Sequence, residues 1–459
     1  MKKIKSTKKL LSILLAVMLL GTLIGCGAGN SNGEETDVEN TDKSDPEKTV
    51  SITFAGWGDL AEKQIYTKLI AAFMDDNPNI KVNYQHYAGG KDAYIVKMVS
   101  LIASDNLPEA FYLPTQDFME WVNAGRLLDL TSYVDSSGTY ADGLIWDQAM
   151  TMYRYNSATG AIGEDGGLYG LPKDLSVRVM VYNVDLFKAN GVETPDPETP
   201  MTYSEYISRA QKLTYGSGTE KVYGTGNYVL DMAVWANSAS YLSDDYTTVT
   251  VDTEEFAEAL QWAADLNLKY GIAPNMTDTS TTDIQRFVNG KMAMMFIGPW
   301  QVATLWQSVD FDFDIAPIPV NEATGLSTTW LDSAALSVSA SASQEKQEAA
   351  YKLIEYISMN EESQRMNYES GQAIPNIIEM AETEFVEMEG VPSNKQLFVN
   401  YLSDTDSYRL KDFYYTMNTE WYDYFDSNVS EVYSGKTTAA DFVKNIQPHL
   451  QELLDASRE

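Results

Sequence analysis

The chain has 459 residues, of which 66 are acidic and 32 are Lys or Arg, so its formal net charge is −34 at pH 7. Such a charge repels phosphate backbones and anionic lipid headgroups, which argues against nucleic-acid binding and against docking on a membrane surface. The composition, with 44% hydrophobic and 12% aromatic residues, is that of a globular chain rich in tyrosine and tryptophan. Aromatic rings with a polar tip are common in wet binding clefts.

The first 26 residues predict export. Five lysines within residues 2–9 precede an apolar run from Leu10 to Leu20, which is shorter than the ~20 residues that a membrane span needs. The following Leu23-Ile24-Gly25-Cys26 resembles the lipobox of bacterial lipoproteins. We therefore expect a signal peptide over residues 1–25 and a lipid on Cys26, which anchors the protein to the outer face of the cytoplasmic membrane. Loss of the five lysines takes the net charge from −34 to −39.

Cys26 is the only cysteine, so no disulfide can form within the chain, and the fold depends on its core. Residues 26–48 lack apolar periodicity and are predicted to be a lipidated flexible tether.

The folded part is expected to begin at residue 49 with alternating strands and helices. The residue pattern predicts strands over 49–54, 80–84 and 110–113, with amphipathic helices around 65–73 and over 94–103 between them. The alternation continues with a strand over 177–182, a helix that Thr202 and Glu205 can cap, helices over 253–270 and 283–289, and a strand over 292–297. Helices over 344–359 and 416–433 complete the pattern, which indicates an α/β protein with mostly parallel sheets.

Several segments resemble, in order, the motifs of family 1 extracellular solute-binding proteins, the maltodextrin-binding-protein-like receptors of ABC importers. The resemblance covers essentially residues 50–455, and the segments that carry it are Asn77-Pro78-Asn79-Ile80-Lys81-Val82, residues 104–110, residues 124–130, Leu168-Tyr169-Gly170-Leu171-Pro172-Lys173-Asp174, residues 182–191, residues 287–294 and Gly298-Pro299-Trp300.

The resemblance implies a two-lobed, periplasmic-binding-protein-like α/β fold with a multi-segment hinge and a ligand cleft between the lobes. Carried onto this sequence, the N-lobe comprises residues 49–174 plus 332–395, and the C-lobe comprises residues 175–331 plus 396–459. It also implies a receptor, not an enzyme, which is a monomer without cofactor or metal, captures a sugar or oligosaccharide and delivers it to the permease subunits by closure.

Sugar rings need aromatic platforms for their apolar faces and carboxylates or amides for their hydroxyls. At the positions where the resemblance implies ligand contacts, the N-lobe supplies Trp57, Asp59, Gln116 and Asp117, and the hinge supplies Asp174, Ser176, Trp330 and Asp332. The C-lobe supplies Trp235, Trp300, Trp421 and Tyr422. For Trp57, Trp235, Trp300, Trp421 and Tyr422 the alternative is packing, for Gln116 and Asp117 ordinary loop polarity, and for Asp174 and Ser176 hydrogen bonding within the hinge.

Three other functions remain open at this point. The acidity of the chain is compatible with a polyamine receptor, and the adjacent Tyr414 and Tyr415 resemble the tyrosine pair of ferric-ion receptors, although their aromatic-rich surroundings favour packing. A glycan-binding surface lipoprotein without a transporter is the third alternative.

Overall fold

The computed structural model describes residues 49–140, 143–163 and 165–458. The predicted signal peptide, Cys26 and the tether up to residue 48 lie outside these residues. Among the described residues, no helix combines the length and the apolar character that a membrane crossing requires.

The N-lobe is built on a five-stranded sheet with the order β2-β1-β3-β13-β7. β1 pairs in parallel with β2 and β3, whereas β13 is antiparallel to both β3 and β7. The strands are β1 (Val50–Trp57), β2 (Ile80–Tyr87), β3 (Ala110–Pro114), β7 (Leu171–Pro172) and β13 (Ala334–Val338). The helices α2 and α12 pack on β1, and α1 packs on β2, so the sheet is covered as the predicted strand–helix alternation requires.

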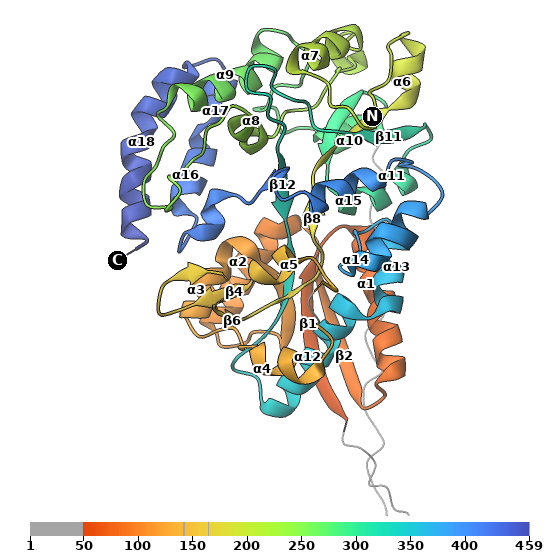
Figure 1. Cartoon of the computed structure of the whole chain (residues 1–459), viewed down its shortest axis with the longest axis vertical. Helices are drawn as coiled ribbons and strands as arrows, with labels where there is room; N and C mark the ends of the chain where they lie inside the picture. The colour runs from red at the N-terminus through yellow and green to blue at the C-terminus, as the bar shows by residue number, and fades with distance from the viewer. Residues whose placement is uncertain (1–48, 141–142, 164, 459) are drawn as a thin grey trace, which may run out of the picture. The chain divides into compact units, whose positions relative to one another are not determined.

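The other N-lobe elements surround this sheet (Figure 1). They are α1 (Leu60–Asp76), α2 (Gly90–Ala103), α3 (Phe118–Asn123), α4 (Thr131–Ser137), α5 (Asp147–Thr151), α12 (Gln344–Met359), α13 (Glu361–Glu369), α14 (Ile378–Met380) and a small sheet of β4 (Arg154–Asn156), β5 (Ala161–Ile162) and β6 (Gly167–Leu168).

The C-lobe contains a three-stranded sheet with the order β10-β9-β11. Its strands are β9 (Val179–Asn183), β10 (Met294–Ile297) and β11 (Phe313–Ala316). Both outer strands are antiparallel to β9, so the expectation of mostly parallel pairing fails for this sheet. The reason is topological: β10 and β11 run in the same direction and are joined through α11 (Val302–Ser308), but β9 lies between them and runs the opposite way.

Helices form the rest of the C-lobe, and α9 packs against α8, α17 and α18. They are α6 (Val184–Ala189), α7 (Tyr203–Lys212), α8 (Leu230–Ala236), α9 (Glu254–Leu268), α10 (Asp283–Val288), α15 (Gln396–Ser403), α16 (Glu420–Asn428), α17 (Ser430–Tyr433) and α18 (Ala439–Ala456).

The lobes are joined by several chain segments, as expected for a multi-segment hinge. A third sheet with the order β14-β12-β8 is made of β8 (Ser176–Val177), β12 (Thr329–Asp332) and β14 (Tyr408–Arg409). Leu331 pairs with Val177 and Thr329 pairs with Tyr408. In Figure 1, β8 and β12 lie between the two halves of the ribbon. The two-lobed α/β fold is thus confirmed, whereas the residue boundaries of the lobes stay a prediction.

Local sequence signals account for some of the element ends. The predicted capping box is present, since the backbone N–H of Glu205 donates to Thr202 Oγ1 at 3.1 Å and that of Thr202 donates to Glu205 Oε2 at 2.9 Å. The predicted helix over 416–433 begins only at Glu420 and breaks at Val429. Thr416 Oγ1 binds the carbonyls of Phe413 and Asn418 instead, and such local side-chain bonds compete with helix formation.

Candidate functional site

A cavity of about 270 Å³ lies where the two lobes meet the hinge. Its lining comes from the end of β1, the start of α1 and α2, both hinge strands β8 and β12, and the C-lobe segment after β10. The lining residues are Trp57, Glu62, Lys91, Pro114, Lys173, Asp174, Ser176, Arg178, Trp300, Trp330, Asp332, Ser333, Ala334 and Gln372. We call it the cleft cavity.

The structure brings half of the predicted ligand-contact residues together at this cavity. They are Trp57, Asp174, Ser176, Trp300, Trp330 and Asp332. Trp57 packs on Tyr94 and Tyr112, with ring centroids 4.9 and 5.1 Å apart. Whether each of these side chains contacts a ligand stays a prediction.

Trp300 owes its position to the glycine two residues before it. A Cβ atom on Gly298 would lie 1.9 Å from the Trp300 ring, so only glycine lets the indole fold back against the backbone. The next turn, Pro299–Gln301, then places the half-buried ring at the cavity.

Four other predicted residues lie near the interlobe surface but do not line the cavity. Asp59 caps α1 by accepting from the Glu62 N–H at 2.9 Å, and its other oxygen accepts from the Thr304 hydroxyl of the C-lobe. Gln116 and Asp117 form the turn after β3. Burial raises the pKa of Asp117 to about 7, Lys91 lowers it, and Glu120 and Asp423 raise it further. Tyr422 is half-buried, with its hydroxyl 3.4 Å from Lys411 Nζ.

Trp235 and Trp421 are buried in the C-lobe, with 1% and 0% of their surface exposed. The indole N–H of Trp421 donates to Thr416 Oγ1 at 3.2 Å, and its ring packs beside Tyr241. Neither tryptophan lines the cleft cavity in this structure, so their surroundings favour the alternative of core packing. Aromatic residues on helices give no sequence signal that separates the two roles.

Several cavity residues were missed from sequence, and Lys173 is the most buried cation among them. It is 5% exposed, and its Nζ lies 2.6 Å from Asp174 Oδ2 and 3.1 Å from Glu62 Oε1. Burial opposes its charge, but the two carboxylates outweigh burial and hold the pKa of Lys173 well above its ordinary value. Lys173 therefore stays charged and fixes both acids at the floor of the cavity.

Arg178 is the second missed cation. Its Cζ atom lies 4.5 Å from the Trp330 ring centroid and 5.3 Å from that of Trp300, which is cation–π geometry. Lys411 Nζ lies 4.2 Å from the Trp330 centroid and 3.4 Å from Asp231 Oδ2. Among the described residues, no carboxylate lies within 4.0 Å of the Arg178 guanidinium. The arginine thus holds the indoles in place and keeps its own donors for another partner.

Three lining residues carry a buried polar atom that has no hydrogen-bond partner among the described residues. They are Arg178 through Nε, Trp330 through Nε1 and Gln372 through Oε1, so two are donors and one is an acceptor. Buried polar atoms are nearly always paired in native proteins, and each exception needs an explanation. The cavity therefore offers donors and an acceptor to a ligand that can use both.

The charges of the lining cancel. Glu62, Asp174 and Asp332 are acidic, and Lys91, Lys173 and Arg178 are basic. Asp332 also has partners within the protein, since it accepts from the Tyr414 hydroxyl at 2.6 Å and from the Ser333 N–H at 3.0 Å. A neutral ligand suits such a lining better than one with a net charge.

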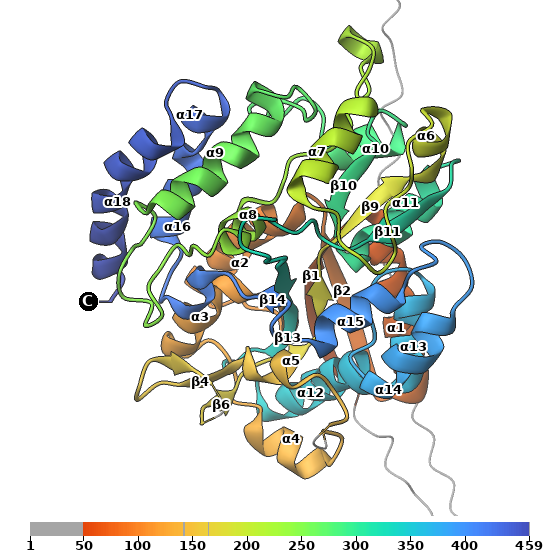
Figure 2. The ribbon, with the colours of Figure 1, turned by 45° about the horizontal axis from the view of Figure 1, so that its top comes forward.

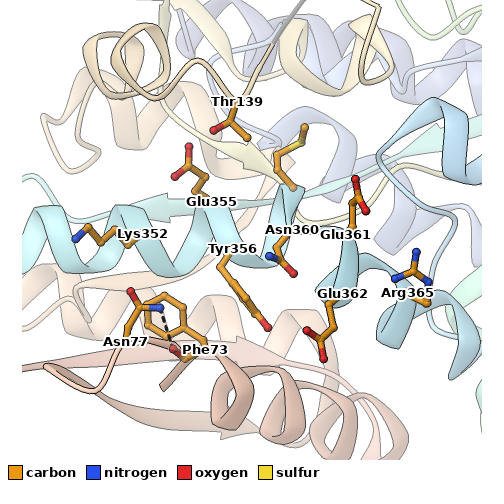
Figure 3. Close-up of a pocket in the computed structure, with 11 residues that line it drawn as sticks. Phe73, Asn77, Thr139, Lys352, Glu355, Tyr356, Asn360, Glu361, Glu362 and Arg365 are labelled. Atoms are coloured by element: carbon orange, nitrogen blue, oxygen red, sulfur yellow. Dashed lines mark hydrogen bonds between the residues drawn. The ribbon is translucent and has the colours of Figure 1, made fainter. Parts of the chain in front are cut away.

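A larger cavity of about 680 Å³ lies on the N-lobe alone, between α1, α12 and α13 (Figure 3). Its two aromatic rings, Phe73 and Tyr356, pack against each other with centroids 5.5 Å apart. Charged side chains such as Lys352, Glu355 and Arg365 make up much of the remaining wall. It lies on one lobe, whereas the cleft cavity lies between the two.

Known proteins match both the sequence and this architecture. Relatives include an arabinooligosaccharide-binding protein of Bacillus subtilis (27% identity over 46% of this chain and 43% of the relative) and a galactooligosaccharide-binding protein of the same species (22% identity over 82% of each chain). The chain spans 43% to 58% of the length of the first curated relatives that it matches.

Solved structures are similar over nearly the whole described chain. An ABC substrate-binding protein from Listeria monocytogenes in complex with cycloalternan superimposes with a TM-score of 0.77 at 26% identity, covering 89% of this chain and 99% of that one. A maltose-bound protein from T. maritima gives a TM-score of 0.70 at 21% identity over 88% and 100% of the two chains, which shows the fold alone. The profile of the bacterial extracellular solute-binding proteins matches residues 68–397, which is more than half of the sequence. This chain therefore belongs to the bacterial extracellular solute-binding protein family.

Proposed function

We propose that this protein is the lipid-anchored receptor of an ABC importer and that it captures a neutral sugar or oligosaccharide in the cleft cavity. The observation that carries the proposal is the set of unpaired polar atoms beside two indole rings. Arg178 Nε and Trp330 Nε1 can donate and Gln372 Oε1 can accept, and a hydroxyl group is both donor and acceptor. The names of the relatives, which bind arabino- and galactooligosaccharides, support the same ligand class.

A polyamine receptor fits this cavity less well. Polyamine recognition needs aromatic faces and unpaired carboxylates around each amine. Here Arg178 and Lys411 contact the Trp330 ring, and Lys173 pairs with Glu62 and Asp174. A cationic ligand would compete with the protein's own cations at the aromatic rings and at these two acids.

Iron binding by the adjacent tyrosines is also disfavoured. The Tyr414 hydroxyl donates to Asp332 at 2.6 Å, and the Tyr415 ring stacks on Tyr246 with centroids 4.2 Å apart. Both side chains therefore have structural partners, in line with the packing interpretation from sequence.

In the proposed mechanism the lobes close around the sugar and present the loaded form to the permease. The sugar favours closure by the difference between its binding free energies for the closed and the open form. The cavity suits this role because Trp57 comes from the N-lobe and Trp300 from the C-lobe, so one ligand can bridge both lobes. Anchoring through Cys26, a monomeric state, the permease partner and the lobe boundaries at residues 174–175, 331–332 and 395–396 belong to the proposal.

Thermal unfolding of residues 27–459 against arabino-, galacto- and maltooligosaccharides, spermidine and ferric citrate tests the proposal. A ligand at ~100 times its Kd adds about 2.7 kcal/mol to the free energy of unfolding. We expect one group of oligosaccharides to raise the unfolding temperature and spermidine and iron to leave it unchanged. A shift with spermidine or iron alone would assign another solute, and release of cleaved glycan would replace the receptor by an enzyme.

A further inference from the structure

A second cavity of about 660 Å³ lies between the lobes and shares no lining residue with the cleft cavity. The N-lobe contributes α5 to its wall, the C-lobe contributes residues 240–246, and the chain around β14 contributes residues 405–415. In Figure 2, α5 and β14 both lie below α8 and α9 of the C-lobe. The volume is in the range of small-molecule sites, about 300–1,000 Å³. We call it the β14 cavity.

Aromatic and apolar side chains form much of its inner surface. Tyr246 and Tyr415 are stacked, with ring centroids 4.2 Å apart and an interplanar angle of 14°. A further cavity of about 520 Å³ is lined by the same two tyrosines, so the stacked pair stands between the two spaces. Half-buried Tyr408 adds a third ring, and Met152 and Leu242 are buried in the same wall. Flat rings next to aliphatic groups suit the apolar face of a sugar.

Polar groups surround these rings. Asp412 is buried, and its Oδ2 accepts from the N–H groups of Tyr241 and Leu242 at 2.9 and 2.8 Å and from the Ser240 hydroxyl at 3.2 Å. These bonds fix the chain after β14 to the C-lobe wall. Asp147, Asp244 and Arg409 are exposed at the rim, where planar carboxylate and guanidinium groups can bind adjacent hydroxyls.

The chain after β14 lines the β14 cavity and contacts two residues of the cleft cavity's wall. Lys411 contacts the Trp330 ring and Tyr414 donates to Asp332, and both of these partners line the cleft cavity. Asp412 and Tyr415, which alternate with them, line the β14 cavity. A molecule bound in the β14 cavity therefore contacts the segment that holds Trp330 and Asp332 of the cleft cavity.

We propose that the β14 cavity is a second binding site, for a neutral sugar of one or two rings, separate from the cleft. The stacked tyrosines serve as its platform and the rim groups bind its hydroxyls. The site does not depend on the identity of the cleft ligand, because the two cavities have different linings.

Saturation-transfer NMR on the full chain, solubilised in a sugar-free detergent, tests this with maltose and lactose as probes. The cleft is first disabled by the double variant Arg178→Ala/Trp300→Ala. We expect both sugars to retain a transfer signal, and addition of Thr151→Trp to abolish it by filling the β14 cavity from α5. Among the described residues, the Thr151 hydroxyl bonds to the carbonyl of Asp147 alone, within its own helix, so its loss removes no tertiary bond there.

Thr67→Trp is the matched control, since Thr67 makes the same bond to Lys63 on the exposed face of α1. The signal must survive this control. If Thr151→Trp lowers the unfolding midpoint, Ser243→Trp fills the cavity from the C-lobe instead. Absence of any signal in the cleft-disabled chain, or a signal that survives both filling variants, overturns the proposal. Failure of the cleft proposal can be told apart from failure of the β14 proposal. If the cleft binds no sugar, wild type and the cleft-disabled chain give the same saturation-transfer signal.

Discussion

Asp59 of the N-lobe accepts a hydrogen bond from the hydroxyl of Thr304 in the C-lobe, with 2.5 Å between the oxygens. The same carboxylate caps α1 through the Glu62 N–H. One side chain thus ties the first helix of the N-lobe to α11 of the C-lobe at the rim of the cleft. The bond exists only when the lobes are close together, so it contributes to the free energy of closure.

Replacing Thr304 by Val should weaken ligand binding without unfolding the protein. The variant loses one hydrogen bond to an exposed carboxylate, worth about 0.5–1 kcal/mol. We expect a two- to fivefold higher Kd for the sugar found in the thermal screen, measured by calorimetry, and an unchanged unfolding midpoint without sugar. Thr67→Val, which removes a hydroxyl from α1 away from the interlobe surface, is the control. Equal affinities for Thr304→Val and wild type would show that this bond does not assist closure.

Lys173 should contribute strongly to the free energy of unfolding. Lys173→Met leaves Glu62 and Asp174 buried without their counter-charge, and breaking a buried ion pair on one side costs about 3–5 kcal/mol. Urea unfolding monitored by circular dichroism measures the loss.

The double variant Lys173→Met/Glu62→Gln is the companion experiment. It should recover part of the lost free energy, because one uncompensated charge is removed with its partner. If the loss in the double variant equals the sum of the losses in Lys173→Met and Glu62→Gln, the two residues are not coupled.

The raised pKa of Asp117 predicts that the stability of the protein depends on pH. Its pKa is raised from 3.8 to about 7, chiefly by burial, so the folded state binds its proton more tightly than the unfolded state does. Stability from this group is fully present below the unfolded pKa and is lost as pH rises from about 4 to 7. Asp117→Asn should therefore flatten the fall in unfolding temperature over this range and be more stable than wild type at pH 8.

The Asp117→Asn variant should still lose some stability as pH rises, because burial raises the pKa of Asp412 to about 6. Parallel curves for Asp117→Asn and wild type would show that Asp117 titrates normally.

Cys26 should carry the membrane anchor. Cys26→Ala removes the thiol that a lipid would modify, and we expect the variant to lose radiolabelled palmitate. Retention of the radiolabel by Cys26→Ala would contradict the anchor prediction.

The N-lobe fold could be predicted from sequence because its strands alternate with amphipathic helices, as parallel pairing requires. The antiparallel C-lobe sheet could not, since β9 pairs with strands that follow it only after a long helical stretch. Local patterns report the type of an element, whereas pairing direction depends on contacts between distant segments.

The candidate site, too, could be predicted from the sequence only in part. Trp300 follows a Gly-Pro turn that resembles the family motif, so its place could be read from the sequence. Arg178 meets Trp330, and Lys173 meets Glu62, only after the chain has folded. A weak signal did exist, because Lys173 stands inside the segment 168–174 that carries the resemblance, and Arg178 follows Ser176 by two residues.

Calorimetric titration of an oligosaccharide into wild type, Arg178→Lys and Trp300→Ala tests the central claim most directly. The lysine keeps the charge but not the planar fork, so we expect it to lose about tenfold in affinity, or about 1.4 kcal/mol. The alanine loses an aromatic platform and should lose at least as much. Trp262→Phe, whose ring stacks on Tyr203 within the C-lobe and lies outside the cleft cavity, should bind like wild type. Wild-type affinity in Arg178→Lys and Trp300→Ala would contradict sugar binding in the cleft cavity.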